Sequence, residues 1–196
     1  YAGRLGAQTV SLTGLIPAVT DLGRALRGGS GAALPTGHAG TASAMGLTLQ
    51  SVLSAARRNI RKERLCFVGL GAIGTATLRT VLGCIDHPEQ ITLCDVVAKR
   101  GELEKLAQEA KSVLGFRGEI RVLTTTGSLP RDAYDADVFV GATNVPNVIA
   151  AEQLRPGTII VDDSFPLCFD LATALRRFRQ SGDILFVSGG SVQVPG

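Results

Sequence analysis

A glycine-rich turn constrains this chain more than any other feature. The segment Gly69-Leu70-Gly71-Ala72-Ile73-Gly74 follows a short apolar run, residues 65–68, and opens a helical pattern over residues 72–82. A continuous apolar run of this length is typical of a parallel strand that is covered on both faces. The sequence therefore predicts a strand, a tight turn and a helix in direct succession.

The same alternation continues along the chain. Further strands are predicted at residues 91–94, 120–124, 137–141, 158–162 and 184–187, and helical segments at residues 100–114, 151–154 and 171–179. Strands that alternate with helices form βαβ units with right-handed crossovers. The predicted fold class is therefore α/β, a doubly wound parallel sheet of the Rossmann type, with a short N-terminal β/α segment from a second lobe.

Each glycine of the turn meets a separate steric demand. Gly69 permits the tight turn out of the strand, Gly71 lets the backbone approach a pyrophosphate, and Gly74 lets the helix pack against the sheet. The first amides of the helix, which include those of Ala72 and Ile73, lie at a terminus with about half a positive charge. We predict that this turn binds the diphosphate of NAD or NADP. The alternative is a glycine-rich turn that binds no nucleotide.

An acidic residue, Asp95, closes the next predicted strand. In dinucleotide-binding folds, an acidic residue about 20 positions after the last glycine of the turn holds the adenosine ribose hydroxyls. Its charge repels a 2′-phosphate and so favours NAD, whereas Lys99 and Arg100 are cations that could accept the 2′-phosphate of NADP. The choice of coenzyme stays open, and a structural role for Asp95 as a cap of the loop is the alternative.

Two further segments end strands at the same edge of the predicted sheet. Ala142, Thr143 and Asn144 follow the strand at residues 137–141, and Ser188 and Gly189 follow the last strand. Ligands of open α/β sheets bind at the carboxyl ends of the strands, near the point where the strand order reverses. We predict that both segments contact the nicotinamide half of the coenzyme. For residues 142–144 an ordinary polar turn is the alternative.

Composition excludes several classes of protein. Hydrophobic residues make up 45% of the 196 and charged residues 19%, so the chain can bury ample apolar surface and is not disordered. The apolar runs are too short for a membrane span of about 20 residues. The net charge is +3, the Arg residues are scattered along the chain, and there are no Trp and only two Tyr, so nucleic-acid binding is not expected. Four Cys without CxxC spacing indicate neither disulfides nor a metal site, and a cytoplasmic location is expected.

The N-terminal part of the chain has a different pattern. Residues 5–13 favour a strand, residues 18–27 a helix, and the turn at residues 35–41 leads into a long amphipathic helix. The apolar stripe of that helix consists of Met45, Leu49, Val52, Leu53 and Ala56. We predict that residues 1–60 are the N-terminal segment and connecting helix of a substrate lobe, and that residues 61–196 are the NAD(P)-binding Rossmann domain.

Short motifs in order along the chain resemble one known family. They are Leu5-Gly6-Ala7-Gln8-Thr9-Val10-Ser11, Thr36-Gly37-His38-Ala39-Gly40-Thr41-Ala42, the turn Gly69 to Gly74, Gly141-Ala142-Thr143, Val161-Asp162-Asp163-Ser164-Phe165-Pro166 and Val187-Ser188-Gly189-Gly190. Together they resemble cyanobacterial long-chain acyl-(acyl-carrier-protein) reductase and its group of predicted dehydrogenases. The resemblance implies reduction of an acyl thioester to an aldehyde with NADPH, through a cysteine thioester, with an acyl carrier protein as a partner.

The chain departs from that family at three points. Its glycine turn is shorter than the family's Gly-Ala-Thr-Gly-Asp-Ile-Gly type of turn, and Asp95 is less suited to NADPH. The family's nucleophilic cysteine lies in a helix beyond the point that matches Gly196. We therefore expect the chain to be a fragment that lacks the catalytic C-terminal part.

The remaining cysteines and histidines give two catalytic candidates, Cys168 and His38. Cys168 follows the strand at residues 158–162 at the expected edge, but only His38 and His87 are available to lower a thiol pKa. Two other cysteines, Cys66 and Cys94, lie within strands and are predicted to be buried. Cys84 lies away from the expected crevice, and His87 is predicted to lie on the surface.

His38 begins the long helix and has two possible roles. It could act as a general acid near neutral pH. Alternatively, Thr36, Gly37, His38 and Thr41 could together hold a substrate carbonyl or phosphate at the helix N-terminus. A capping turn without chemistry is the third interpretation.

Three functions follow from these observations. The first is an NAD(P)-dependent oxidoreductase that resembles reductases of acyl thioesters. The second is a shikimate- or methylenetetrahydrofolate-type dehydrogenase, which shares the long helix and needs no cysteine. The third is a dinucleotide-binding module without catalysis. In each case a small-molecule or acyl-thioester ligand and self-association are expected.

Overall fold

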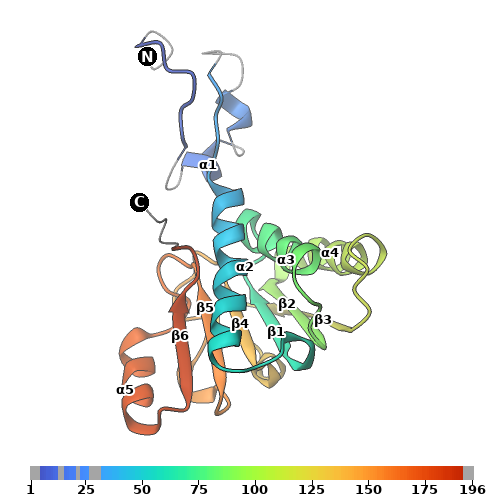
Figure 1. The fold of residues 1–196 in the computed structure, drawn as a ribbon, viewed down its shortest axis with the longest axis vertical. Coiled ribbons are helices and arrows are strands. Elements are labelled where there is room, and N and C mark those ends of the chain that lie inside the picture. Colours follow the sequence, from blue (N-terminus) through green and yellow to red (C-terminus); the bar gives the residue numbers. More distant parts are fainter. Residues whose placement is uncertain (1–4, 13–15, 21–22, 27–31, 192–196) are drawn as a thin grey trace. The chain divides into compact units, whose positions relative to one another are not determined.

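The structure is a computed structural model that describes residues 5–12, 16–20, 23–26 and 32–191. The chain divides into two compact units, residues 1–40 and 41–196. The second unit contains a six-stranded sheet with the strand order β3-β2-β1-β4-β5-β6 (Figure 1). All five strand pairs are parallel.

Every strand predicted in residues 61–196 is present. The strands are β1 (Arg64–Val68), β2 (Gln90–Val96), β3 (Glu119–Thr125), β4 (Val138–Gly141), β5 (Thr158–Asp162) and β6 (Ile184–Ser188). Strands β1 and β4 are neighbours in the sheet although two strands separate them in sequence, so the strand order reverses there. The fold is thus the predicted doubly wound α/β sheet, and its carboxyl edge has a switch point between β1 and β4.

Helices cover both faces of this sheet. The α-helices are α2 (His38–Ala55), α3 (Ala72–Cys84), α4 (Arg100–Ser112) and α5 (Leu171–Ser181), and the 3-10 turns are η3 (Ile60–Lys62), η4 (Val97–Lys99), η5 (Arg131–Asp135) and η6 (Ala151–Gln153). Helix α4 ends two residues before the predicted end at residue 114. Gly115 there has a φ of +69°, and the Phe116 N–H donates to the Ala110 carbonyl, which closes the helix.

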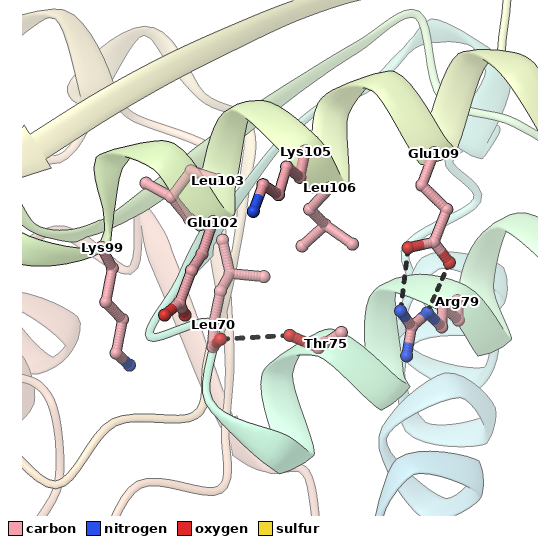
Figure 2. Close-up of a pocket in the computed structure, with 9 residues that line it drawn as sticks. All are labelled: Leu70, Thr75, Arg79, Lys99, Glu102, Leu103, Lys105, Leu106 and Glu109. Carbon is pink, nitrogen blue, oxygen red and sulfur yellow. Dashed lines mark hydrogen bonds and ion pairs between the residues drawn. The ribbon is translucent and has the colours of Figure 1, made fainter.

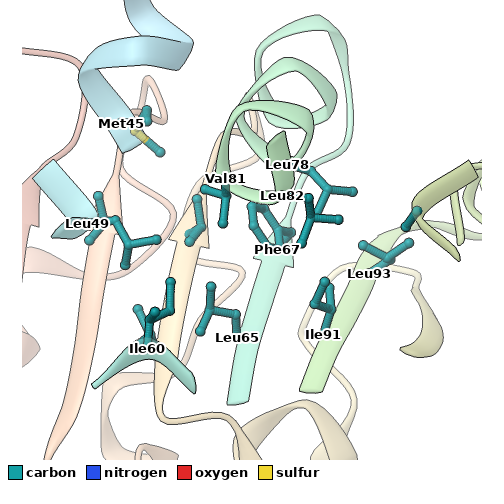
Figure 3. Close-up of a cluster of buried hydrophobic side chains, with 14 of the residues drawn as sticks. Met45, Leu49, Ile60, Leu65, Phe67, Leu78, Val81, Leu82, Ile91 and Leu93 are labelled. Carbon is teal, nitrogen blue, oxygen red and sulfur yellow. The ribbon is translucent and has the colours of Figure 1, made fainter. Parts of the chain in front are cut away.

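The larger hydrophobic core lies between the sheet and helices α2, α3 and α4. Figure 3 shows part of this core, where Leu78 of α3 lies beside Phe67 of β1, and Met45 and Leu49 of α2 lie farther along the same face of the sheet. Of the predicted stripe on α2, Met45, Leu49, Val52 and Leu53 are buried. Ala56 is exposed, because the helix ends at Ala55 and Arg57 adopts a positive φ of 55°. A second core on the opposite face includes Ala174 of α5 and the segments η5 and η6.

The first unit differs from the expectation for residues 18–27. Its described residues hold two single turns, α1 (Ile16–Val19) and η2 (Arg24–Leu26), instead of one helix. Gly23, with a φ of +82°, interrupts the helical path between them. The strand expected at residues 5–13 is reduced in the described part to one bridge, Thr9 to Ala33, and residue 13 lies outside the described residues. The assignment of residues 1–60 to a substrate lobe stays a prediction.

Candidate functional site

The glycine turn has a geometry that only glycine allows at two positions. Gly69 has a φ of +86°, and a Cβ at this residue would lie 2.6 Å from the Ala142 carbonyl oxygen. A Cβ on Gly74 would lie 1.9 Å from the Gly69 carbonyl oxygen. Both distances are far below van der Waals contact, so the turn and the helix approach each other closely because these residues lack side chains. A Cβ on Gly71, in contrast, would meet no heavy atom within 4 Å, so the space beside it is open.

The N-terminus of α3 presents free amides at this open space. No side chain caps the helix at Gly71. Within the described part of the chain, the N–H groups of Gly71, Ala72 and Ile73 have no hydrogen-bond acceptor. The turn itself is fixed by the Thr75 hydroxyl, which donates to the Leu70 carbonyl at 3.1 Å. Free amides and the positive end of a helix dipole are features that favour the binding of an anion.

Asp95, at the end of β2, is tied to the glycine turn. Its Oδ2 accepts hydrogen bonds from the Leu70 N–H at 2.7 Å and from Lys99 Nζ at 3.0 Å, and its Oδ1 accepts from the Val96 N–H. The side chain is only 8% exposed. The structure therefore gives Asp95 a structural role in holding the turn, which is the alternative considered above. Binding of ribose hydroxyls by the same carboxylate stays a prediction.

A cleft of about 240 Å³ lies between helices α3 and α4, beside the turn (Figure 2). Leu70, Leu103 and Leu106 form its apolar floor, and charged side chains from both helices line its walls. Arg79 and Glu109 pair across the cleft at 2.7 Å. Arg100, which was predicted to accept a 2′-phosphate, pairs with Glu104, and Lys99 pairs with Asp95. Both predicted cations are thus already partnered by carboxylates.

A smaller pocket of about 110 Å³ lies at the carboxyl edge of the sheet, on the other side of the turn. It is lined largely by apolar atoms of β1, β2 and the segments after β3 and β4: Val68, Gly69, Cys94, Asp95, Val96, Thr125, Thr126, Gly127, Thr143, Val145 and Val148. Sequence reasoning missed residues 125–127, Val145 and Val148. The signal was present, because residues 125–127 follow a predicted strand at the same edge.

Polar side chains organise the carboxyl ends of β4 and β5. The Thr143 N–H donates to the Ser164 hydroxyl at 3.0 Å, and the Ser164 N–H donates to Asp162 Oδ1 at 3.0 Å. Asp162 is buried and also accepts from the Cys168 N–H and thiol, at 3.1 and 3.2 Å. Asn144, in contrast, is exposed. A network from β5 thus positions Thr143, whereas sequence reasoning considered Thr143 alone.

The environment of Cys168 disfavours a role as nucleophile. The residue is fully buried, and burial together with the negative charge of Asp162 raises the pKa of its thiol well above the ordinary value. A thiol held in its neutral form is a poor nucleophile.

Cys66 and Cys94 are buried as predicted, and Cys84 is exposed at the end of α3. His87 is half-buried rather than on the surface, because its Nε2 contacts the Leu82 carbonyl at 2.9 Å and its ring packs on Phe116.

Sequence reasoning also missed Asp163, the residue that follows β5. Its N–H donates to the Gly141 carbonyl, and its carboxylate lies against Gly190, where a Cβ would be only 1.7 Å from Asp163 Oδ1. Gly189 is buried, and its N–H donates to the Asp162 carbonyl at 2.8 Å. Ser188 is exposed at the end of β6. The predicted residues 188 and 189 therefore lie beside a half-buried carboxylate that the sequence pattern did not single out.

The residues predicted to bind substrate lie around the start of α2. In the first unit, His38 Nδ1 and the Thr36 hydroxyl are 2.6 Å apart, and Gly37 has a φ of +75°. Thr41 is half-buried. The Thr36 contact shows that the imidazole ring is held by a local hydrogen bond. Substrate binding by these residues and acid catalysis by His38 stay predictions.

The fold defined by the sheet and the glycine turn is the doubly wound fold of dinucleotide-binding domains. No protein-family profile and no curated protein sequence matches the chain. Among solved structures, D-mandelate dehydrogenase of Rhodotorula graminis matches with a TM-score of 0.55 and 18% identity, over 94% of this chain and 59% of that one. Shikimate 5-dehydrogenase of Listeria monocytogenes, solved with shikimate and NAD, matches with a TM-score of 0.51 and 13% identity, over 74% of this chain and 52% of that one.

A third match is Δ1-pyrroline-2-carboxylate reductase of Thermococcus litoralis, solved with NADH and L-proline. Its TM-score is 0.50 and its identity 20%, over 70% of this chain and 41% of that one. The chain therefore spans about half the length of the solved structures it matches. At these identities the likeness establishes the shared fold. In the described residues, no helix is long and apolar enough to cross a membrane.

Proposed function

We propose that this chain is the dinucleotide-binding part of an NAD(P)-dependent oxidoreductase. The observation that supports this most directly is the turn before α3. Gly69 and Gly74 close it tightly, while the amides of Gly71, Ala72 and Ile73 face open space without a partner in the described chain. A diphosphate would supply the missing acceptors and would complement the helix dipole. Two of the similar structures were solved with NAD or NADH, which is consistent with this assignment.

The two halves of the coenzyme would lie on opposite sides of the turn. The pocket lined by Val96, Thr125 and Val145 is narrow and mostly apolar, as an adenine ring requires. The diphosphate would then bind at α3, and the nicotinamide nucleotide would extend over the carboxyl ends of β4, β5 and β6. The Ser188-Gly189 segment lies at the end of β6, and Thr143, after β4, borders the adenine pocket on the side toward those ends. NAD and NADP both stay open as coenzymes, because each predicted phosphate-binding cation is paired with a carboxylate.

The substrate class is a carbonyl compound that accepts a hydride, with the acyl thioester as the first candidate. The motif resemblance supports it, and an acyl carrier protein would then be a partner. A cysteine-thioester route needs a nucleophile other than Cys168, which is buried with a raised thiol pKa. A shikimate-type dehydrogenase is the second candidate, because its chemistry needs no thiol. Self-association and a cytoplasmic location stay predictions from the sequence.

Coenzyme titration of a matched pair of variants tests the binding site. In Gly71→Asp a carboxylate would occupy the diphosphate position, yet the new Cβ meets no atom within 4 Å and φ is −73°, so folding is preserved. We expect the variant to bind NADH and NADPH at least about 100-fold more weakly than the wild type, with unchanged thermal unfolding. Gly101→Asp serves as the control, because its Cβ also meets open space. Unchanged coenzyme binding by Gly71→Asp would show that the turn is not the site.

Substrate turnover is tested separately from binding. Oxidation of NADPH is followed by absorbance after addition of a long-chain acyl thioester, and reduction of NAD⁺ after addition of shikimate. Turnover of the thioester would support the first candidate and turnover of shikimate the second. Coenzyme binding without turnover of either would favour a binding module, or an enzyme whose catalytic residues lie outside this chain.

A further inference from the structure

Asp163 is a carboxylate without a counter-charge at the carboxyl edge of the sheet. Its side chain is half-buried, and no group in the described residues donates a hydrogen bond to it or forms an ion pair with it. Among the described residues, the charged neighbour that acts on it is another acid, Asp162. The other contacts of Asp163 in the described residues are with uncharged groups: its N–H donates to the carbonyl of Gly141 at the end of β4, and its carboxylate lies against Gly190 after β6. Burial of an uncompensated negative charge is unfavourable.

The position of Asp163 matches the nicotinamide end of the coenzyme in the proposed function. If the adenosine half lies over β1, β2 and β3, the other nucleotide must extend across the switch point to β4, β5 and β6. Asp163 follows β5, and its N–H is bonded to the last residue of β4, Gly141. Its carboxylate also touches Gly190, just beyond the end of β6. It thus lies at the centre of the three strand ends over which the ring would be placed.

The oxidised and reduced rings differ in charge. The nicotinamide ring of NAD⁺ or NADP⁺ carries one positive charge, and the dihydronicotinamide ring of NADH or NADPH carries none. A carboxylate that has no cationic partner in the protein is attracted to the positively charged oxidised ring. The neutral reduced ring offers it no charge to pair with. We infer that Asp163 makes this site select the oxidised over the reduced form of its nicotinamide coenzyme. The inference rests on the proposed function, since it requires the coenzyme to bind in this orientation.

The selectivity should depend on pH in a definite direction. Burial and the charge of Asp162 raise the pKa of Asp163 above its ordinary value. The oxidised ring stabilises the ionised carboxylate, so its binding lowers that pKa and releases a proton when it occurs near the pKa. Above the pKa of Asp163 the preference is fully present. As pH falls through that pKa, the carboxylate becomes neutral and the preference is lost.

The test compares dissociation constants of the two redox forms in three proteins. NAD⁺ and NADH, or NADP⁺ and NADPH if these bind more tightly, are titrated calorimetrically into the wild-type chain, Asp163→Asn and Asp132→Asn. Asp132 is an exposed carboxylate in η5, at the opposite edge of the sheet, so it controls for the change in net charge. We expect the ratio of the Kd for the reduced form to the Kd for the oxidised form to fall about fivefold to tenfold in Asp163→Asn. It should stay at the wild-type value in Asp132→Asn.

The outcomes distinguish the role of Asp163 from the proposed function. An unchanged ratio in Asp163→Asn, with coenzyme still bound, would refute the role of Asp163 and leave the proposed function standing. Absence of binding by the wild type to all four coenzyme forms would refute both. Circular dichroism establishes whether Asp163→Asn folds. If it does not fold, the same ratio measured on the wild type decides, as the pH is lowered from 8 to the ordinary aspartate pKa: a fall on acidification supports the inference, and a constant ratio overturns it.

Discussion

Two carboxylates at the same edge of the sheet, Asp95 after β2 and Asp163 after β5, have opposite environments. Asp95 receives hydrogen bonds from two backbone amides and an ion pair from Lys99. Asp163 receives none of these from the described residues and faces Asp162 instead. One half of the edge is therefore electrostatically complete within the protein. The other half has a charge that the described residues leave uncompensated.

The comparison separates structure from ligand binding. A carboxylate with all its partners in the fold contributes to the stability of the fold, as Asp95 does for the glycine turn. A half-buried carboxylate with a like-charged neighbour lowers stability, and such residues are often retained for function. In the proposed function, the adenosine half of the site would thus depend on backbone geometry and the nicotinamide half on charge.

The largest effect is expected from a change in the backbone geometry of the glycine turn. Gly74→Ala places a Cβ 1.9 Å from the Gly69 carbonyl oxygen, so the turn and α3 must separate. We expect unfolding free energy to fall by about 2–4 kcal/mol, and NADH binding to be lost. Denaturant titration and calorimetry measure the two quantities. Gly83→Ala in the same helix meets open space, and we expect it to stabilise the protein by about 0.5–1 kcal/mol. Equal behaviour of the two variants would show that close packing at Gly74 is unimportant.

A smaller effect is expected at Asp95. Asp95→Asn removes the ion pair with Lys99 and weakens the hydrogen bond from the Leu70 N–H. We expect a loss of about 1–3 kcal/mol in unfolding free energy, because this side chain is buried. Coenzyme affinity should fall about tenfold as the turn loosens. Asp86→Asn, which removes an exposed pair with Arg61, is the control and should change neither quantity measurably. Wild-type stability of Asp95→Asn would contradict a structural role for Asp95.

The smallest effect, and one of opposite sign, is expected at Asp163. Its pKa is raised in the folded chain by burial and by Asp162, so the folded state binds a proton more tightly than the unfolded state. Ionisation of Asp163 therefore lowers stability as pH rises through its folded pKa, and Asp163→Asn should restore it. We expect a gain of about 1–3 °C in melting temperature at pH 7, which disappears as the pH is lowered below the ordinary aspartate pKa. A loss of stability at pH 7 would show that the carboxylate has a stabilising partner.

The sequence predicted the fold and the position of the glycine turn well for local reasons. Most strands contain a short apolar run, and the close approach of Gly74 to Gly69 involves residues only five apart, so both are visible in the local sequence. The prediction failed at residues 18–27, where Gly23 with a positive φ interrupts a helical pattern of side chains. It was incomplete at Cys168, whose neutral thiol results from burial and from Asp162, six residues earlier.

What the sequence determined by itself is the order of strands and helices and the glycine turn, since these follow from periodicity and from the absence of side chains. The tertiary structure alone decided how the charges are distributed. Asp95 and Asp163 are both acids that follow a strand, and only the folded chain shows that one meets Leu70 and Lys99 while the other meets Gly190 and Asp162. The contacts with Leu70 and Gly190 come from distant parts of the chain, and both environments depend on burial. Neither property can be read from local sequence.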